Sequence, residues 1–392
     1  MTPAARVQSA IELLDLVIGA AIAQGAPADR ILADWFKTRR FVGSKDRRAI
    51  RELVYAAIRG CGAVPQSGRA AMLRLAEDDL ALAALFDGSQ YGPARPRAGE
   101  PVAAGGIAPE WLTRRLAASD IAGEEARALL GRAPLDLRVN TLKASRATIA
   151  LPVEAAPSAA PHGLRMASGT PIEQTEAWRE GLIEVQDTGS QLACLAVGAL
   201  PGETVIDLCA GGGGKTLALA AAMKNSGRLI ASDTDRGRLA RLAPRAERAG
   251  ATMIETRLLD PGRELEALGD LAGIADVVLV DAPCSGTGTW RRNPEARWRT
   301  TPATLTRAVV AQEHLFDIAA ELVRPGGRLI YVVCSLLDEE GSGQFGAALV
   351  RHGGLSAMPL DLPLGGPRGQ GLRLSPFRDG TDGFFIAGAT SS

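Results

Sequence analysis

The chain has 392 residues, no net charge and 46% apolar residues, which is ordinary for a soluble globular protein and enough for more than one buried core. No long uncharged apolar run occurs, and Glu12 and Asp15 interrupt the first apolar stretch, so neither a membrane span nor a secretory signal is expected. The five cysteines and three histidines are widely spaced, so we expect no metal site and reduced thiols in a cytoplasmic protein.

Residues 1–87 are expected to form an all-helical domain. Apolar residues recur at helical spacing from Val7 to Ile18, Ser44 precedes a second amphipathic stretch, and a third covers residues 69–85. Residues 88–109 are dense in glycine and proline and are interpreted as a linker.

The run KTRRFVGSKDRR, residues 37–48, is strongly basic although the whole chain is neutral. Such a run is either the solvated face of a helix or a patch that contacts phosphates. The sequence alone leaves both interpretations open.

Residues 110–199 predict a small α+β segment. Residues 110–130 have a helical pattern, residues 137–142 alternate like a strand, a second short strand is expected in residues 181–187, and residues 190–200 predict a helix.

From residue 200 to residue 392 the pattern changes to alternating strands and helices. This alternation predicts an α/β domain with a mostly parallel sheet covered by helices on both faces. The expected strands cover residues 204–208, 228–232, 276–283 and 328–335, and the expected helices cover residues 215–223, 236–250 and 305–323.

Ligands of such sheets bind at the carboxyl ends of the strands, where the loop DLCAGGGGKT, residues 207–216, is expected. A phosphate-binding P-loop would need glycine at Cys209, and a dinucleotide-binding loop would need glycine at Thr216, so both patterns fail. Asp233 follows the next strand at a spacing that suits ribose hydroxyls. A nucleoside ligand without phosphates fits these features, which points to S-adenosylmethionine.

Two cysteines follow neighbouring predicted strands. Cys284 comes directly after Pro283, and Cys334 ends the strand RLIYVVCS. A single free cysteine is usually buried and inert, but two at the ligand-binding edge suggest thiol chemistry. Carbon 5 of cytosine is a poor nucleophile until a thiolate adds to carbon 6, and the adduct must later lose its carbon-5 proton and expel the thiol.

Three segments, DLCAGGGGKT, DAPCSGTGTWRRNPEARWR and VVCSLLDEEG, resemble the signature segments of the Sun-type (RsmB-like) RNA cytosine-5 methyltransferases. LRVNTLK, VQDTGSQLA and GTDGFF also match that family, and the basic N-terminal helices resemble its NusB-like RNA-binding domain. The resemblance implies a Rossmann-like class I methyltransferase domain in residues 200–392, preceded by the NusB-like domain and by a small RNA-binding segment.

The resemblance also implies roles for single residues. Cys334 is similar to the nucleophile that adds to carbon 6, and Cys284 to the helper that releases the product. Asp281 and Lys215 are similar to the residues that reach the target base. The implied S-adenosylmethionine site consists of Cys209, Ala210, Gly211, Gly212, Gly213, Gly214, Lys215, Asp233, Asp260 and Asp281.

The loop after Cys284 mixes arginines with tryptophans. This mixture suits RNA phosphates and stacked bases, although internal stacking in a surface loop is the alternative. The residues concerned are Trp290, Arg291, Arg292, Arg297, Trp298 and Arg299. The sequence departs from the family at Gly211–Gly212, where Ala-Pro is usual, and at Val333, where Thr is usual; both departures concern fine geometry and not the reaction class.

We therefore expect a monomeric RNA methyltransferase that acts on 16S ribosomal RNA. The alternatives are a tRNA substrate with the same chemistry, a non-catalytic ribosome-assembly factor, and DNA methylation. In DNA enzymes the cysteine of a Pro-Cys motif attacks, which would make Cys284 the nucleophile.

Overall fold

The computed structural model describes residues 1–392, and its contacts divide the chain into two compact units. The first unit comprises Met1–Gly131 and Thr289–Pro302, and the second comprises Arg132–Gly288 and Ala303–Ser392. This division differs from the expected one, because residues 110–131 and the loop 289–302 group with the N-terminal helices. No helix is long and apolar enough to span a membrane.

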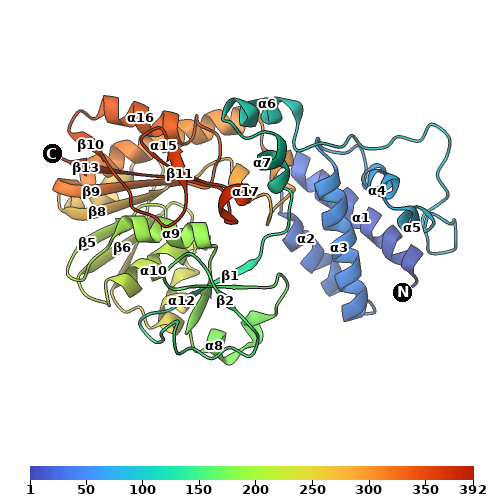
Figure 1. Ribbon diagram of the computed structural model, residues 1–392, viewed down its shortest axis with the longest axis horizontal. Coiled ribbons are helices and arrows are strands. Elements are labelled where there is room, and N and C mark those ends of the chain that lie inside the picture. Colours follow the sequence, from blue (N-terminus) through green and yellow to red (C-terminus); the bar gives the residue numbers. More distant parts are fainter. The chain divides into compact units, whose positions relative to one another are not determined.

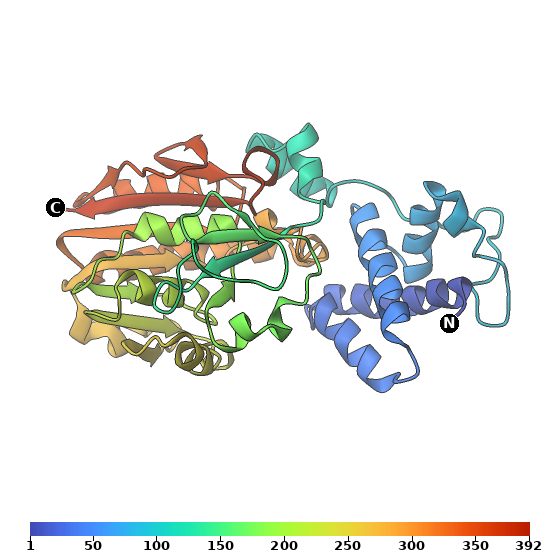
Figure 2. The ribbon, with the colours of Figure 1, turned by 60° about the horizontal axis from the view of Figure 1, so that its bottom comes forward.

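The first unit is helical. In Figures 1 and 2 its long helices α1 and α3 cross one another, and their apolar faces meet in one core that also includes residues of α2 and α4. Its helices are α1 (Pro3–Ile22), α2 (Ala28–Thr38), α3 (Ser44–Gly60), α4 (Gly68–Glu77), α5 (Leu80–Ala83), α6 (Glu110–Ala118), α7 (Gly123–Ala128) and α14 (Ala296–Arg299).

The stretch expected as one helix over residues 69–85 is divided into α4 and α5. The side chain of Asp79 accepts hydrogen bonds from the backbone N–H groups of Ala81 and Leu82, at 2.9 and 3.0 Å, and so starts a new helix. Aspartate favours helix starts over helix interiors because its short side chain competes for backbone N–H groups.

The loop 289–302 is part of the interior of the helical unit, so the expectation that its tryptophans and arginines face RNA is wrong for most of them. Trp298 packs in the helical core, and Trp290, Arg291 and Arg297 are buried as well. The guanidinium of Arg297 donates to the carbonyl oxygens of Ile58 and Cys61, at 2.6 and 2.7 Å.

Residues of the loop 289–302 form hydrogen bonds with backbone groups at the ends of α2 and α3. Helix α3 ends at Gly60, where carbonyl groups lack intrahelical partners, and Arg297 supplies a cation and donors there. At the start of α2, where Pro27 offers no side-chain cap, Glu295 accepts from the backbone N–H of Ala28 at 3.0 Å.

Replacing Arg297 by methionine should therefore destabilise the protein. The variant keeps much of the side-chain volume but removes the guanidinium donors from both carbonyls, so that Ile58 keeps only the 3.3 Å hydrogen bond from the Cys61 N–H. This loss should cost about 2–4 kcal/mol in the free energy of unfolding. Urea unfolding followed by tryptophan fluorescence measures the effect. The control is Arg48→Met, since Arg48 is exposed on α3; equal losses in the two variants would contradict this role of Arg297.

The second unit is built on a nine-stranded sheet (Figure 1). Five neighbouring strands in the order β9-β8-β5-β6-β7 are parallel, and β13, β12, β11 and β10 add an antiparallel edge beside β9. The strands are β5 (Thr204–Asp207), β6 (Arg228–Asp233), β7 (Ile254–Leu258), β8 (Ala275–Asp281), β9 (Val323–Val333), β10 (Leu355–Met358), β11 (Gly366–Arg368), β12 (Gly371–Leu374) and β13 (Phe384–Ser391).

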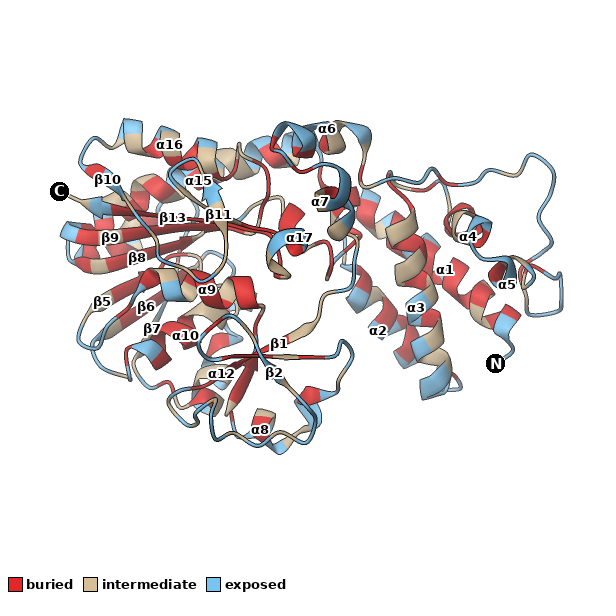
Figure 3. Ribbon diagram, viewed as in Figure 1, coloured by how far each residue is buried: buried red, intermediate tan, exposed pale blue.

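Helices cover both faces of this sheet, and its strands are buried along most of their length (Figure 3). One face packs on α9 (Thr188–Val197), α10 (Gly214–Ala222), α11 (Arg236–Leu239) and α12 (Leu242–Ala249). The other face packs on α13 (Glu264–Leu268), α15 (Pro302–Leu322) and α16 (Ser342–Arg351). The expected α/β fold, with a mostly parallel sheet between two layers of helices, is confirmed.

The stretch expected as one helix over residues 236–250 is two helices, α11 and α12. Pro244 lies in the first turn of α12, and a proline there cannot continue a helix from α11, because its ring collides with the carbonyl of the preceding turn. The four antiparallel strands after α16 were not expected from the sequence.

A small antiparallel sheet with the order β2-β3-β1-β4 precedes the large one. The motif LRVNTLK anchors it: Asn140 donates to the carbonyl oxygens of Gly181 and Ala249, at 2.8 and 2.7 Å, and Lys143 donates to that of Arg248 at 2.7 Å. The remaining elements are β1 (Leu135–Val139), β2 (Ala156–Pro157), β3 (Gly163–Met166), β4 (Ile183–Val185), α8 (Glu176–Arg179), α17 (Pro376–Asp379) and the short 3₁₀ turns η1 (Ile172–Gln174), η2 (Gly269–Leu271) and η3 (Thr287–Thr289).

Candidate active site

The two cysteines meet because their strands are parallel neighbours. Asp281 at the end of β8 pairs with Val332 near the end of β9, so the chain leaves both strands at the same edge of the sheet. Cys284 lies three residues after β8, and Cys334 directly follows β9. Their sulfur atoms are 3.4 Å apart and share a hydrogen bond in which either thiol can be the donor.

The hydrogen bond with Cys334, followed by burial, raises the pKa of the Cys284 thiol well above its usual range. Cys284 therefore stays protonated at neutral pH and can donate to the sulfur of Cys334.

A buried carboxylate holds the loop that carries Cys284. Glu340 is fully buried and accepts hydrogen bonds from the backbone N–H of Ser285 at 2.8 Å, from the Ser285 hydroxyl, and from Gln312 Nε2 at 3.1 Å. The same Gln312 nitrogen donates to the carbonyl oxygen of Pro283 at 2.9 Å. The residues on both sides of Cys284 are thus fixed by Glu340 and Gln312, which sequence reasoning did not select.

Replacing Glu340 by glutamine should slow turnover about 10- to 100-fold with little change in KM. The amide has only one oxygen to accept with, so one of the two Ser285 donors loses its partner and Cys284 is less well held. Steady-state methyl transfer measures the effect, and Glu313→Gln on the outer side of α15 is the control. An unchanged kcat would contradict this positioning role.

Lys215 and Asp281 form an ion pair beside the cysteines. Lys215 lies at the start of α10, and its Nζ is 2.6 Å from Asp281 Oδ2; the two side chains are 12% and 28% exposed. Burial alone would lower the pKa of Lys215, but the charge and hydrogen bond of Asp281, together with the nearby Cys194 and Cys334, outweigh burial and raise it. The site therefore holds a permanent cation and a carboxylate next to the two sulfurs.

Phe384 forms one wall of this group. The ammonium of Lys215 lies 5.7 Å from the centre of its ring. The backbone N–H of Gly383 donates to the carbonyl oxygen of Gly288 at 2.8 Å, and a Cβ at Gly288 would lie only 2.1 Å from the Gly383 oxygen. A Cβ at Gly383 would in turn lie 2.7 Å from Gly288 Cα, which explains the second glycine of the motif GTDGFF. Phe384 itself was matched to the family but not selected as a site residue.

The glycine loop Cys209–Gly214 connects β5 to α10. Gly213 has a φ of +83°, and a Cβ there would lie 2.1 Å from Leu242 Cδ1, so no other residue fits without displacement. The backbone N–H of Gly211 donates to Asp233 Oδ2 at 2.8 Å, which ties the loop to the end of β6.

The remaining expected cofactor residues lie at the same edge. The backbone N–H of Leu259 donates to the carbonyl oxygen of Asp233 at 3.0 Å, so Asp260, which is exposed, follows directly beside it. The structure thus gathers all the expected site residues at the carboxyl ends of β5, β6, β7, β8 and β9.

Asp207 is a further acidic residue that sequence reasoning did not select as a site residue. It is fully buried at the end of β5 and accepts a hydrogen bond from the Thr216 hydroxyl at 2.7 Å, while its second oxygen has no partner. Burial, together with the charges of Asp281 and Asp233, raises the pKa of Asp207 to about 7.

Because this pKa is above that of an unfolded aspartate, Asp207 favours the folded state less as pH rises. Between about pH 4 and 7 the unfolded chain loses the proton first, which costs about 1.4 kcal/mol per pH unit and a few kcal/mol in total. Asp207→Asn should therefore be more stable than the parent at pH 8, and the difference should vanish near pH 4. Urea unfolding across this range measures it, with exposed Asp361→Asn as control; parallel curves for parent and Asp207→Asn would contradict the prediction.

The family model described as 16S rRNA methyltransferase RsmB/F matches residues 195–389, which include all of these side chains. A ribosomal RNA small subunit methyltransferase B from Xylella fastidiosa is 34% identical over 290 residues, covering 71% of this chain and 67% of that protein. The chain belongs to the RsmB/F family. The probable ribosomal RNA small subunit methyltransferase B of Synechocystis is 36% identical over 270 residues, or 64% of this chain and 59% of that protein. The chain thus spans about three fifths of the length of this relative.

Two solved structures share the fold of this chain. The structure of PH0851 has a TM-score of 0.77 at 26% identity and covers 99% of both chains. NSun6 from Pyrococcus horikoshii, solved with SFG, has a TM-score of 0.63 at 20% identity over 71% of this chain and 97% of that one, which is a likeness of fold. The cofactor of this methyltransferase family is S-adenosylmethionine.

Proposed function

We propose that the protein methylates carbon 5 of a cytosine in small-subunit ribosomal RNA, with S-adenosylmethionine as methyl donor and a covalent cysteine adduct as intermediate. The observation that carries the proposal is the pair of sulfur atoms 3.4 Å apart beside the Lys215–Asp281 ion pair. The family of the chain and the names of its relatives support RNA methylation.

The residues of the glycine loop and the adjacent strand ends fit S-adenosylmethionine. Asp233 and Asp281 both act on the buried Asp207, and Lys215 pairs with only Asp281, so the site favours a ligand with positive charge. Asp233 and Asp260 lie where carboxylates can bind hydroxyl groups, and the glycines leave the backbone open to approach. S-adenosylmethionine supplies a methyl group on a positively charged sulfur.

Cys334 is proposed to form a bond from its thiolate to carbon 6 of the cytosine. The addition moves electron density to carbon 5, which can then take the methyl group from S-adenosylmethionine, with S-adenosylhomocysteine as the leaving group. To finish, carbon 5 gives its proton to a base and the bond between carbon 6 and the Cys334 sulfur breaks. Cys284, protonated and in hydrogen-bond contact with that sulfur, stabilises the departing thiolate.

The Lys215–Asp281 pair is proposed to hold the target base. A cytosine offers an amino group as donor and a ring nitrogen and carbonyl oxygen as acceptors, which match a carboxylate and an ammonium. Lys215 stays protonated and is placed to stabilise the negative charge that thiolate addition brings to the ring.

RNA binding is proposed to involve the basic run of the helical unit. Lys37, Arg40, Lys45 and Arg48 are exposed there, beside Phe41, which is also exposed. Such a patch suits phosphates with a base stacked between them. That this unit is NusB-like stays a prediction.

The test incubates the protein with S-adenosylmethionine and, in parallel, with unmodified small-subunit ribosomal RNA, tRNA and duplex DNA, followed by mass spectrometry of the nucleosides. The expected product is 5-methylcytidine in the ribosomal RNA. A product only in tRNA or only in DNA would reject the proposed substrate. RNA binding without any methylated nucleoside would indicate an assembly factor instead.

A further inference from the structure

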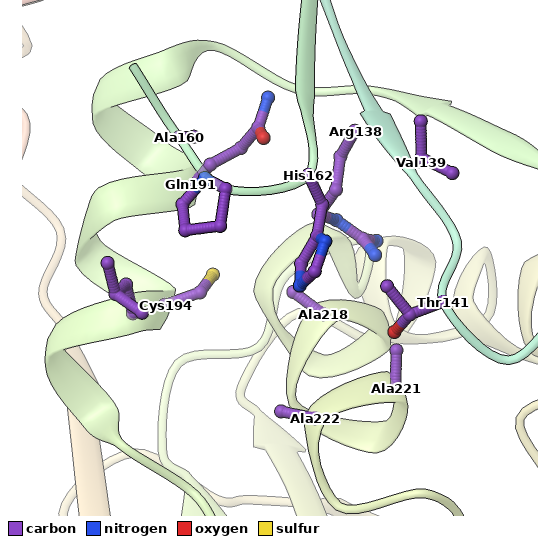
Figure 4. A pocket seen from close by; sticks show the side chains of 12 residues that line it. Arg138, Val139, Thr141, Ala160, His162, Gln191, Cys194, Ala218, Ala221 and Ala222 are labelled. Carbon is purple, nitrogen blue, oxygen red and sulfur yellow. The ribbon is translucent and has the colours of Figure 1, made fainter. Parts of the chain in front are cut away.

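A cavity of about 120 Å³ lies in the second unit, between β1, the loop that carries His162, and helices α9 and α10 (Figure 4). None of the residues that line it belongs to the candidate active site. Its walls are mostly apolar and include Val139, Pro161, Leu195, Ala218, Ala221 and Ala222.

The polar side chain that decides the chemistry of this cavity is Arg138. It is only 6% exposed, and its guanidinium makes one hydrogen bond, from Nε to Gln186 Oε1 at 2.6 Å. Nη2 has no partner and Arg138 forms no ion pair. In Figure 4 the guanidinium points into the space between His162, Thr141 and the alanines of α10.

No neighbouring group neutralises this buried cation. Glu184, the acidic residue that acts on Arg138, is bound by Arg245 at 2.9 Å and by Arg248. Burial raises the pKa of Cys194 to about 11, so this thiol stays protonated. Burial and the nearby arginines lower the pKa of His162, so its ring is neutral and adds no charge of either sign.

The side-chain oxygen of Gln191, which also lines the cavity, is a hydrogen-bond acceptor without a partner. Gln191 is 5% exposed; its nitrogen donates to the carbonyl oxygens of Leu137 and Gln186, at 3.1 and 2.8 Å, while its oxygen accepts nothing. Buried polar atoms without partners are costly, and a buried cation without an anion is costlier. A ligand that satisfies both atoms needs an anionic group and a hydrogen-bond donor.

We propose that this cavity binds a small hydroxycarboxylate: the carboxylate pairs with Arg138, the hydroxyl donates to Gln191, and a short hydrocarbon part lies against the alanines of α10. A planar carboxylate matches the guanidinium fork, and the apolar walls favour it over inorganic phosphate. The volume limits the ligand to a few carbon atoms, since a cavity of about 150 Å³ holds a molecule the size of benzene.

The test uses the full-length protein and 2-hydroxybutyrate as probe, with binding measured by ligand-observed NMR. Butyrate lacks the hydroxyl donor and 2-hydroxybutyramide lacks the charge, so both should bind at least tenfold more weakly than the probe. S-adenosylmethionine should not displace it. Equal binding of the probe and its amide, or no binding of the probe, would overturn the proposal.

Two variants locate the site. Arg138→Met removes the charge and should weaken binding of the probe at least tenfold, while Arg179→Met, at an exposed arginine of α8, should not change it. If Arg138→Met fails to fold, Ala221→Leu fills the cavity without removing the cation and should also abolish binding. Unchanged binding in Ala221→Leu, or a crystal structure with the probe that shows only an ordered water at Arg138 Nη2, would contradict the proposal.

Discussion

Cys334→Ala is expected to lose methyl transfer to RNA by a factor on the order of 10³ or more. Without the thiol, carbon 6 receives no electron pair, and carbon 5 stays too weak a nucleophile. The fold should persist, because the side chain is only partly buried and alanine is accommodated after β9. Transfer of radiolabelled methyl groups at saturating RNA measures the loss.

The matched control for this variant is Cys194→Ala, which removes a thiol that is outside the candidate active site and stays protonated. It should retain most of the activity. If Cys334→Ala kept more than about a tenth of the parent rate, Cys334 would not be the attacking thiol.

Lys215→Met should reduce kcat by about 10²- to 10⁴-fold with a smaller change in KM for RNA. The variant removes the cation that stabilises negative charge on the cytosine ring. This charge develops during thiolate addition and is absent from the bound substrate, so its loss affects kcat more than KM. Steady-state kinetics separate the two effects, and Lys224→Met, at an exposed lysine just after α10, is the control.

Asp281→Asn, alone and combined with Lys215→Met, tests whether the two residues act together. Because the two side chains form one ion pair, the double variant should lose much less than the product of the two single losses. Independent, multiplicative losses would contradict a joint role of Lys215 and Asp281 in holding the base.

Much of the second unit follows from local sequence. Short apolar runs rich in branched residues predict buried parallel strands, and in such a sheet the ends of neighbouring strands meet at one edge. The proximity of Cys284 and Cys334 could therefore be predicted from two segments 50 residues apart. The C-terminal strands were missed, because β11 and β12 span only three and four residues in a stretch rich in glycine and proline.

Other features depend on contacts that no local pattern reveals. Arg297 and Trp298 belong to a basic, aromatic run that is typical of an RNA-binding surface, yet they complete the ends and the core of helices more than 200 residues earlier in the chain. Glu340 was part of a recognised motif, but its role emerges only when the hydroxyl and backbone of Ser285 are seen to donate to it.

The burial of the Arg138 guanidinium likewise could not be predicted from local sequence. In the sequence it is one residue of an alternating strand, and alternation alone would place a charged side chain toward solvent. Only the packing of α9 and α10 against β1 shows that it is buried beside a cavity.

The proposed roles of the two cysteines are tested most directly by a denaturing gel of Cys284→Ala and Cys334→Ala. Each variant is incubated with S-adenosylmethionine and small-subunit ribosomal RNA, and any protein that carries RNA is then mapped by peptide analysis. We expect an RNA-linked band for Cys284→Ala only, with the RNA attached to Cys334, because that variant forms the adduct but releases it slowly. An adduct that forms only in Cys334→Ala, attached to Cys284, would contradict these roles and reverse them.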